Sequence, residues 1–330
     1  MTSRLVFTPI ESSNATEKYV DELKDNDGDG MPLYIPKMEY SAKDKKGFMP
    51  VKRGELIAVI GRPGNAKTGF MFRWARERAK HLAQIKSNDV VLYWTMEQLI
   101  EELRLFHVAA EMNVSASDMA SGQYQEWDGV KNTLRNLHTT PLWLAGKSRA
   151  RRKDKIKLTE AALIESLEAV EKWQDENILQ GIDSIYIDYL QRFRSDGRDW
   201  TQFYGDVVNG LKEAAGDFST RVILGVQAKR EVDKYDVPIP AGEDGQWTSG
   251  IEQQADGTIT LCRPSHYKNK GETFDGVTVT SHKHLIVNVA KRKMGPENFH
   301  EWVDFAPEYN KMDNVEIKQY DLRRARGEDE

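Results

Sequence analysis

The stretch at residues 54–80, GELIAVIGRPGNAKTGFMFRWARERAK, limits the fold of this chain more than any other part of its sequence. An apolar run leads into a glycine-rich turn, and Lys67 and Thr68 follow the turn at the start of a segment with helical spacing. This is the pattern G-x-x-x-x-G-K-[ST] of a phosphate-binding loop, except that Ala66 stands where the pattern has its second glycine. The sequence therefore predicts a β-strand, a phosphate-binding turn and an α-helix in direct succession.

The predicted loop offers the groups that a nucleoside triphosphate needs. Backbone N–H groups at a helix N-terminus bind phosphate oxygens, a lysine reaches the β and γ phosphates, and a hydroxyl joins the shell of Mg²⁺. Lys67 and Thr68 supply the lysine and the hydroxyl, so we expect ATP or another nucleoside triphosphate together with Mg²⁺. The expected nucleotide-binding residues of the loop are Gly61, Arg62, Pro63, Gly64, Asn65, Ala66, Lys67 and Thr68.

Ala66 leaves two outcomes open. If the backbone at this position is near-helical, alanine is tolerated and only its methyl group must fit beside the phosphates. If the position needs a positive φ, the methyl group costs about 1 kcal/mol or more and nucleotide binding weakens. A glycine-rich turn without any ligand is the third interpretation of the motif.

The rest of the chain predicts an α/β fold. Short apolar runs alternate with segments of helical length, which is typical of a mainly parallel sheet flanked by helices. The runs are ELIAVI, DVVLYWT, TPLWLA, SIYIDYL, RVILGV, GTITLC and HLIVNVA. We expect a polar N-terminal arm at 1–50 with a short helix at 16–24, one ATPase domain at 51–310 with a helix at 159–173, and a charged tail at 311–330.

Two acidic residues stand at the ends of predicted strands. SIYIDYLQ places Asp188 where a carboxylate can hold the magnesium shell, and VVLYWTMEQL places Glu97 where a base can orient an attacking water. Either acid alone is weak evidence, because such residues also cap helices. Their order after the loop strengthens the prediction of an NTP-hydrolysing site.

With these motifs in order, residues 30–308 resemble the RecA-like motor domain of DnaB-type replicative helicases. The resemblance rests on GELIAVIGRPGNAKT, VLYWTMEQ, IDYLQ, VQAKR, SGIEQQAD and KRKMGP. IDYLQ and SGIEQQAD are its most specific parts, since other ATPases share the phosphate loop. The fold that the resemblance implies is a RecA-like P-loop NTPase core.

The resemblance also implies roles for single residues. Lys67 and Thr68 would bind phosphate and Mg²⁺, Glu97 would be the catalytic base, Asp188 the second magnesium ligand and Gln227 the sensor of the γ phosphate. Lys291 and Lys293 would act on the neighbouring subunit's nucleotide. The expected DNA-binding residues are Arg192, Arg194, Arg198, Lys229, Arg230 and Lys234.

The activity that the resemblance implies is that of an ATP-dependent DNA helicase, a homo-oligomeric ring or spiral of six subunits on single-stranded DNA. Primase, a loader and other replication proteins would be further partners. Residues 1–50 are too few for the family's N-terminal collar domain, which favours a phage or mobile-element form.

Lys293 departs from the family pattern, which has an arginine finger there. Arg292 lies one place away, and on a strand it faces the opposite side. Lysine lacks the guanidinium fork, so we expect a weaker contribution to phosphoryl transfer in the neighbouring subunit. Two alternatives therefore stay open: a regulatory or recombinase-like DNA-binding ATPase that does not unwind DNA, and a non-hydrolysing loader or scaffold.

Composition adds limits of its own. The net charge of −5 argues against a uniformly basic nucleic-acid coat but permits a local basic channel. The stretch 147–157, KSRARRKDKIK, could bind DNA or a partner, or could be solvated surface. The chain has no apolar run of membrane-spanning length, no secretory leader and a single cysteine, so we expect a cytoplasmic protein without membrane contact.

Two possible metal sites have better structural explanations. DNDGDG at 25–30 matches half of a calcium loop, but Pro36 takes the place of the required glutamate, so we expect an acidic turn. Cys262, His266, His282 and His284 match no common zinc spacing, so we expect structural roles.

Overall fold

A nine-stranded sheet forms the centre of the described chain, in the order β11-β10-β9-β6-β1-β5-β4-β2-β3. The structure, a computed structural model, describes residues 30–95, 97–149, 181–193, 199–246, 249–306 and 311–314 and the single positions 13, 17, 168 and 172. Six neighbouring strands from β6 to β3 run parallel, and β9, β10 and β11 add antiparallel pairs, so the predicted mainly parallel sheet is confirmed. The strands are β1 (Leu56–Gly61), β2 (Val90–Thr95), β3 (Leu142–Gly146), β4 (Ile182–Asp188), β5 (Arg221–Gln227), β6 (Gly257–Cys262), β9 (His284–Arg292), β10 (Phe299–Ala306) and β11 (Lys311–Asn314).

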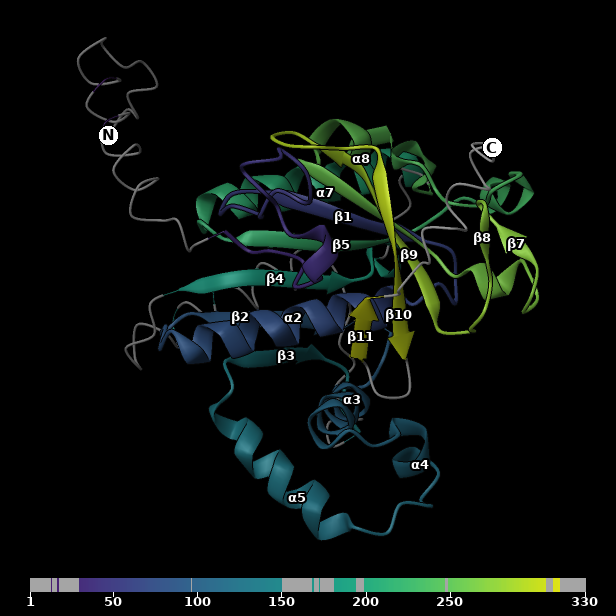
Figure 1. The fold of residues 1–330 in the computed structure, drawn as a ribbon. Helices are drawn as coiled ribbons and strands as arrows, with labels where there is room; N and C mark the ends of the chain where they lie inside the picture. Colours follow the sequence, from purple (N-terminus) through teal and green to yellow (C-terminus); the bar gives the residue numbers. More distant parts are fainter. Residues whose placement is uncertain are drawn as a thin grey trace.

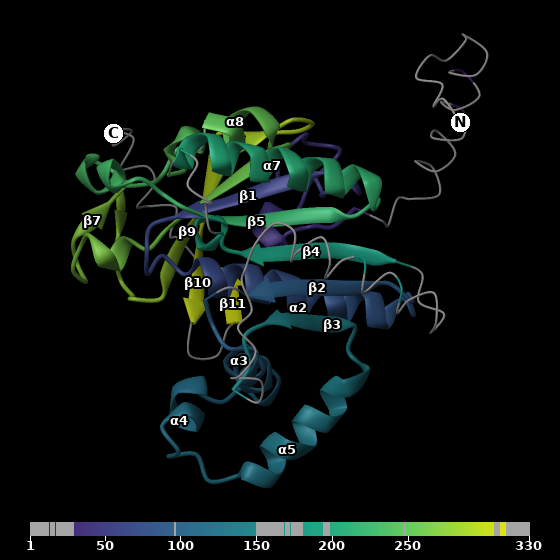
Figure 2. The same cartoon turned by 180° about the vertical axis from the view of Figure 1, so that it is seen from behind.

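Helices cover both faces of this sheet. Helix α2 lies in front of the strands in Figure 1, and α7 lies in front of them in the reverse view of Figure 2. Helices α3, α4 and α5 form a small separate layer beyond β3. The helices are α2 (Lys67–Gln84), α3 (Ile100–Met112), α4 (Ala116–Ala120), α5 (Trp127–Asn136), α7 (Trp200–Asp217) and α8 (Ser249–Gln254).

Short elements complete the described fold. A hairpin of β7 (Thr273–Phe274) and β8 (Val277–Thr278) packs on the residues around Cys262. The 3₁₀ turns are η1 (Pro36–Met38), η2 (Leu137–Thr139), η3 (Leu190–Arg192), η4 (Arg230–Lys234), η5 (Gly242–Asp244) and η6 (Pro264–His266). The predicted helices at 16–24 and 159–173, the acidic turn before Gly30, the basic stretch after Arg149 and the chain after 314 lie outside the described residues, apart from the single positions.

Strand β1 shows why the sheet needs cover on both sides. All six of its residues are buried, and successive side chains point to opposite faces. Leu56, Ala58 and Ile60 join a core with residues of α7, whereas Ile57 and Val59 join a core with residues of α2. The sequence ELIAVI is therefore apolar at successive positions because both faces of strand β1 are buried.

The described part of the predicted arm contributes to the core. Met31, Leu33, Ile35, Phe48 and Val51 are buried in the same cluster as the residues of α2. Two main-chain hydrogen bonds join Met31 and Val51, which closes this segment into a loop on the domain. The boundary that polar composition predicts at residue 50 falls inside this packed segment.

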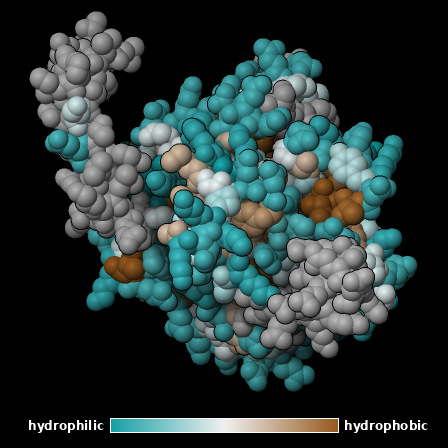
Figure 3. Space-filling model, turned by 45° about the horizontal axis from the view of Figure 1, so that its top comes forward, coloured by the Kyte–Doolittle hydropathy of each residue, from teal (hydrophilic) through white to brown (hydrophobic). Residues whose placement is uncertain are grey.

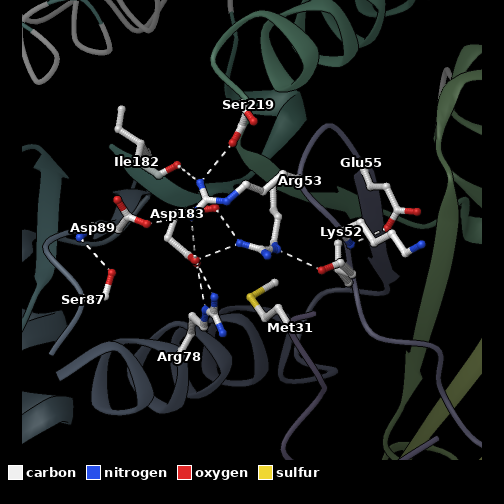
Figure 4. A network of polar contacts seen from close by, with 12 residues as sticks. Met31, Lys52, Arg53, Glu55, Arg78, Ser87, Asp89, Ile182, Asp183 and Ser219 are labelled. Atoms are coloured by element: carbon white, nitrogen blue, oxygen red, sulfur yellow. Dashed lines mark hydrogen bonds and ion pairs between the residues drawn. The ribbon is translucent and has the colours of Figure 1, made fainter. Parts of the chain in front are cut away.

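A cluster of buried charged side chains lies at the amino ends of the parallel strands (Figure 4). Asp183 at the start of β4 accepts hydrogen bonds from Arg78 of α2 (2.9 Å to Nε) and from Arg221 of β5 (2.8 Å to Nη1). Arg53 lies 3.7 Å from the same carboxylate and donates to Asp89 at 2.7 Å. The cluster ties α2 to β4 and β5, and to the segments that precede β1 and β2, at the sheet edge opposite the phosphate loop.

The face in Figure 3 is mostly hydrophilic, with small separate hydrophobic areas. Among the described helices, none has the length and apolar character needed to cross a membrane.

Candidate nucleotide-binding site

The phosphate loop joins β1 to α2, as the sequence predicts. Gly64 has a φ of +81°, and a Cβ atom at this position would lie 2.7 Å from Cε1 of His266. Glycine is therefore required at position 64 by the backbone conformation and by the close approach of the histidine ring.

Parallel pairing collects the other predicted residues at the same edge of the sheet. Gly61 at the end of β1 is in register with Gln227 at the end of β5, and Thr95 of β2 is in register with Asp188 at the end of β4. A cavity of about 280 Å³ opens at this edge. Its lining residues are Pro63, Gly64, Ala66, Lys67, Thr68, Gly69, Glu97, Tyr189 and Gln227.

Ala66 adopts the strained alternative. Its φ of 62° and ψ of 20° are left-handed, and it is the residue that precedes the first turn of α2. Its carbonyl accepts the first helical hydrogen bond, from the N–H of Phe70 at 2.8 Å. The loop therefore keeps the shape that glycine would favour, with the strain of a methyl group in that conformation.

Lys67 points into the cavity region. Its Nζ donates to the Gly61 carbonyl at 3.0 Å and lies 5.5 Å from the centre of the Tyr189 ring. Burial lowers the pKa of Lys67 below its ordinary value, against the opposing effect of Asp188 and Glu97. The ammonium group is placed to meet phosphate oxygens, which would replace the carbonyl as its partner.

Asp188 and Thr68 fit a magnesium site. Asp188 is fully buried, and its Oδ2 accepts from the hydroxyl of Tyr93 at 3.1 Å, while its Oδ1 has no hydrogen-bond partner. Burial raises the pKa of Asp188 above its ordinary value, although the neighbouring Thr68 hydroxyl, the charge of Lys67 and the hydrogen bond from Tyr93 act in the other direction. A buried carboxylate oxygen without a partner, beside a hydroxyl, matches the oxygen ligands that Mg²⁺ prefers.

Glu97 lines the cavity from the segment after β2. Its Oε1 accepts from Nη2 of Arg192 at 2.9 Å, and both side chains are 44% exposed. The predicted base and one predicted DNA contact therefore form an ion pair with each other.

Gln227 lines the cavity at the end of β5 and is tied to IDYLQ. The N–H of Gln227 donates to Oε1 of Gln191 at 3.0 Å, and Nε2 of Gln191 donates to the carbonyl of Gln246 at 3.2 Å. The side chain of Gln191, which precedes Arg192, thus holds both ends of the segment 227–246, which contains the predicted DNA contacts Lys229, Arg230 and Lys234.

Arg62 and Asn65 turn their side chains away from the cavity. Asn65 is buried, and its Oδ1 accepts from the N–H of Arg263 at 2.7 Å, which fastens the loop to the segment after β6. Arg62 donates to the carbonyl of Ala228 at 3.1 Å and pairs with Asp233. These two side chains shape the loop through protein contacts.

Lys291 and Lys293 do not line this cavity. Nζ of Lys291 donates to the carbonyl of Glu252, and Nζ of Lys293 lies 3.5 Å from Oδ1 of Asp256. Arg292 faces the other side, as its strand position predicts, and pairs with Glu55 at 2.8 Å in a buried site. Action of the two lysines on a neighbouring subunit stays a prediction.

The predicted DNA contacts are described in part. Arg230 and Lys234 are exposed on η4, whereas Nζ of Lys229 donates to the carbonyl of Glu243 at 2.7 Å. Arg194 and Arg198 lie outside the described residues, as does most of the basic stretch 147–157.

The structure adds three residues that the sequence did not single out. Tyr189 forms a wall of the cavity, Tyr93 holds Asp188, and Gln191 joins the two predicted DNA segments. Tyr189 and Gln191 both stand in IDYLQ, so that motif was the available signal. No sequence signal singled out Tyr93, because its position in an apolar strand indicates only a core residue.

The other proposed metal ligands have structural roles where they are described. Cys262 is buried, and burial raises the pKa of its thiol to about 12. His284 lies between Asp304 and Thr280, at 2.8 Å from each. Within the described ranges, no three histidine, cysteine or acidic side chains gather as a metal site.

Comparison with known families agrees with this geometry. The family described as the DnaB-like helicase C terminal domain matches residues 43–314. The chain belongs to this DnaB-like family. The resemblance drawn from IDYLQ and its neighbouring motifs is therefore confirmed.

Relatives in this family are about a quarter identical to the chain over the aligned residues. Replicative DNA helicase DnaB of Geobacillus stearothermophilus is 25% identical over 305 residues, and replicative DNA helicase DnaC of Bacillus subtilis is 26% identical over 305 residues. Each alignment covers 90% of this chain and 60% of the relative. The chain thus spans about 60% of the length of these relatives.

Two solved structures have the same fold. One solved ATPase domain superposes with a TM-score of 0.71 at 19% identity, covering 92% of this chain and 98% of that domain. A DnaB-like replicative helicase, studied with its interactions with primase, also gives a TM-score of 0.71 at 19% identity, covering 92% of this chain and 67% of that one. The predicted RecA-like core is confirmed as the fold of this DnaB-like chain.

Proposed function

We propose that this chain is the ATP-hydrolysing motor of a DNA helicase or translocase that acts as a ring or spiral, with six subunits, on single-stranded DNA. One observation carries the proposal: Lys67, Thr68, Glu97 and Gln227 line one cavity, with Asp188 buried behind it. Family membership supports the proposal, because the relatives are named replicative DNA helicases.

The proposed reaction is hydrolysis of the γ phosphate. The oxygen of a water forms a bond to the γ phosphorus, the bond to the bridging oxygen breaks, and Glu97 takes the proton of the water. Lys67 would bind the β and γ phosphates, and Gln227 would contact the γ phosphate. Mg²⁺, held through Thr68 and Asp188, would neutralise charge that develops on the phosphate oxygens.

The DNA contacts and the assembly are part of the same proposal. Arg192, Lys229, Arg230 and Lys234 lie at or near the ends of β4 and β5, so DNA bound there would lie close to the nucleotide. Cationic side chains on such loops bind the phosphates of single strands. A primase and a loader would be partners, as the name of one structural neighbour mentions primase for that protein.

A non-hydrolysing loader or scaffold is a second candidate. Ala66 keeps a left-handed backbone with a methyl group, and Lys293 pairs within its own chain with Asp256. The strained backbone at Ala66 would weaken nucleotide binding, and a lysine in place of an arginine finger at position 293 would weaken turnover. This candidate predicts nucleotide binding without hydrolysis, or neither binding nor hydrolysis.

Steady-state ATP hydrolysis with and without single-stranded DNA separates the two candidates. The motor requires turnover that DNA stimulates and that Lys67→Ala and Glu97→Gln both abolish. If turnover of the wild type equals that of Glu97→Gln while nucleotide still binds, the loader or scaffold is the better description. A strand-displacement assay on forked DNA then distinguishes a helicase from a DNA-binding ATPase that does not unwind.

A further inference from the structure

The ion pair between Glu97 and Arg192 joins two roles that the sequence assigned separately. Glu97 is the proposed base, and Arg192 is a proposed DNA contact, yet Nη2 of Arg192 lies 2.9 Å from Oε1 of Glu97. Because the Arg192 guanidinium donates to this carboxylate, Glu97 cannot use the same oxygen lone pair to accept a proton from water.

The surroundings keep the Arg192 guanidinium at the border of the cavity. Arg192 ends η3, and its guanidinium carbon lies 5.5 Å from the centre of the Tyr189 ring. Tyr189 lines the cavity, and Nζ of Lys67 lies 5.5 Å from the same ring. The guanidinium of Arg192 therefore lies beside a wall of the cavity, next to the proposed base.

An ion pair of this kind is open to competition. Both side chains are 44% exposed, and exposed ion pairs are weak. A guanidinium binds phosphate through two parallel hydrogen bonds, so a phosphate of the DNA backbone can replace a single carboxylate oxygen. This competing phosphate is present only when single-stranded DNA occupies the adjoining loops.

We propose that Arg192 is a positioning residue that restrains Glu97 in the DNA-free protein, and that a phosphate of single-stranded DNA draws Arg192 away and frees Glu97 to accept the proton of the attacking water. The inference rests on the proposed function. It explains why DNA would stimulate hydrolysis: Arg192 exchanges the Glu97 carboxylate for a phosphate of the DNA.

The experiment compares ATP turnover without DNA and at saturating oligo-dT. Arg192→Ala is expected to raise turnover without DNA about fivefold and to bring the stimulation ratio close to one, because an exposed ion pair of about 1 kcal/mol is lost. Arg192→Lys, which keeps the charge but not the fork, is expected to give intermediate values. Arg135→Ala, at an exposed arginine of α5, is the matched control and should behave as the wild type.

Arg230→Ala shows what loss of a proposed DNA contact alone does to the oligo-dT concentration for half stimulation. If Arg192→Ala also changes only that concentration, and its DNA-free turnover is not raised, Arg192 is a plain DNA contact and the inference is wrong. A wild type without DNA-stimulated turnover would overturn the proposed function and this inference together. If DNA stimulates turnover of the wild type and Arg192→Ala keeps the wild-type ratio of turnover with and without DNA, the inference alone is overturned.

Discussion

Arg62 of the phosphate loop and Asp233 of η4 form a forked ion pair. Nε of Arg62 lies 3.1 Å and 3.0 Å from the two oxygens of Asp233, and Nη2 lies 2.8 Å from Oδ2. The hydroxyl of Tyr267 donates to the same carboxylate at 3.0 Å. Because η4 also carries Arg230 and Lys234, the pair links the nucleotide loop directly to a proposed DNA segment.

Asp233→Asn is expected to reduce the coupling between nucleotide and DNA binding. A partly exposed ion pair contributes up to about 1 kcal/mol, which corresponds to a factor of about 5. The ratio of DNA affinities with and without a non-hydrolysable ATP analogue should therefore fall by a factor of about 2 to 5. Fluorescence anisotropy of labelled oligo-dT measures both affinities.

The matched control is Asp236→Asn, at an exposed acid of the same segment, which removes the same charge. If both variants change the ratio equally, the effect is one of net charge and the link through Arg62 carries no coupling.

Ala66→Gly is expected to stabilise the protein. A left-handed conformation costs a residue with a side chain about 1–2 kcal/mol, and the greater freedom of glycine in the unfolded chain offsets about 0.4–1 kcal/mol of the gain. The free energy of unfolding should rise by about 0.5–1 kcal/mol in a urea titration. Ala66→Val should lower it, since a β-branched residue tolerates this conformation worst. A lower stability of Ala66→Gly would contradict the left-handed backbone at position 66.

Asp183→Asn is expected to destabilise the protein strongly. The substitution leaves Arg78 and Arg221 buried without their carboxylate, and breaking such a pair costs about 3–5 kcal/mol. Asp89→Asn, at the more accessible end of the same cluster, removes one partner of Arg53 and should cost at most about 1 kcal/mol. Equal losses in urea unfolding would show that the buried cluster adds nothing beyond a surface pair.

The same cluster predicts a loss of stability in acid. Burial alone would raise the pKa of Asp183, but the hydrogen bond from Arg78 and the charges of Arg221, Arg78 and Arg53 outweigh it and hold the pKa below its ordinary value. The contribution of Asp183 is therefore present above the unfolded-state pKa and is lost as the pH falls through the lower folded-state pKa. Comparison of the wild type with Asp183→Asn should show a difference that shrinks in this acidic range.

The sequence predicts the site well where local spacing determines geometry. Gly61, Lys67 and Thr68 belong to one strand-turn-helix unit, so their mutual placement follows from a few residues. Asp188 could be expected near them because parallel strands end at one edge, although a sequence does not give the strand order. Gln227 was expected there only through the family resemblance.

Contacts between segments that are far apart in the sequence could not be predicted from it. Arg62 and Asp233 are separated by 171 residues, and Glu97 and Arg192 by 95, so no local pattern pairs them. The packed loop at 30–51 was also missed, because its buried residues Met31, Leu33 and Phe48 are scattered among polar ones. Polar composition describes a segment's average, whereas burial depends on which side chains face the domain.

The raised pKa of Asp188 predicts opposite effects of Asp188→Asn on stability and on nucleotide binding. Burial raises the folded-state pKa, so the folded protein binds this proton more tightly than the unfolded chain does. The stability from Asp188 is thus fully present below the unfolded-state pKa and is lost as the pH rises through the folded-state pKa. At neutral pH without Mg²⁺, neutral asparagine should therefore raise the free energy of unfolding, because it removes a buried charge.

The same variant should lose the Mg²⁺-dependent part of nucleotide affinity, because the cation needs the carboxylate oxygen that has no partner in the protein. In the wild type this part should weaken on acidification at a higher pH than an ordinary aspartate would give, since protons compete with the cation. Thermal unfolding without Mg²⁺ and calorimetric titration of nucleotide with and without Mg²⁺ measure the two effects. An Asp188→Asn variant that is both less stable and unchanged in Mg²⁺ dependence would show that Asp188 is a structural residue.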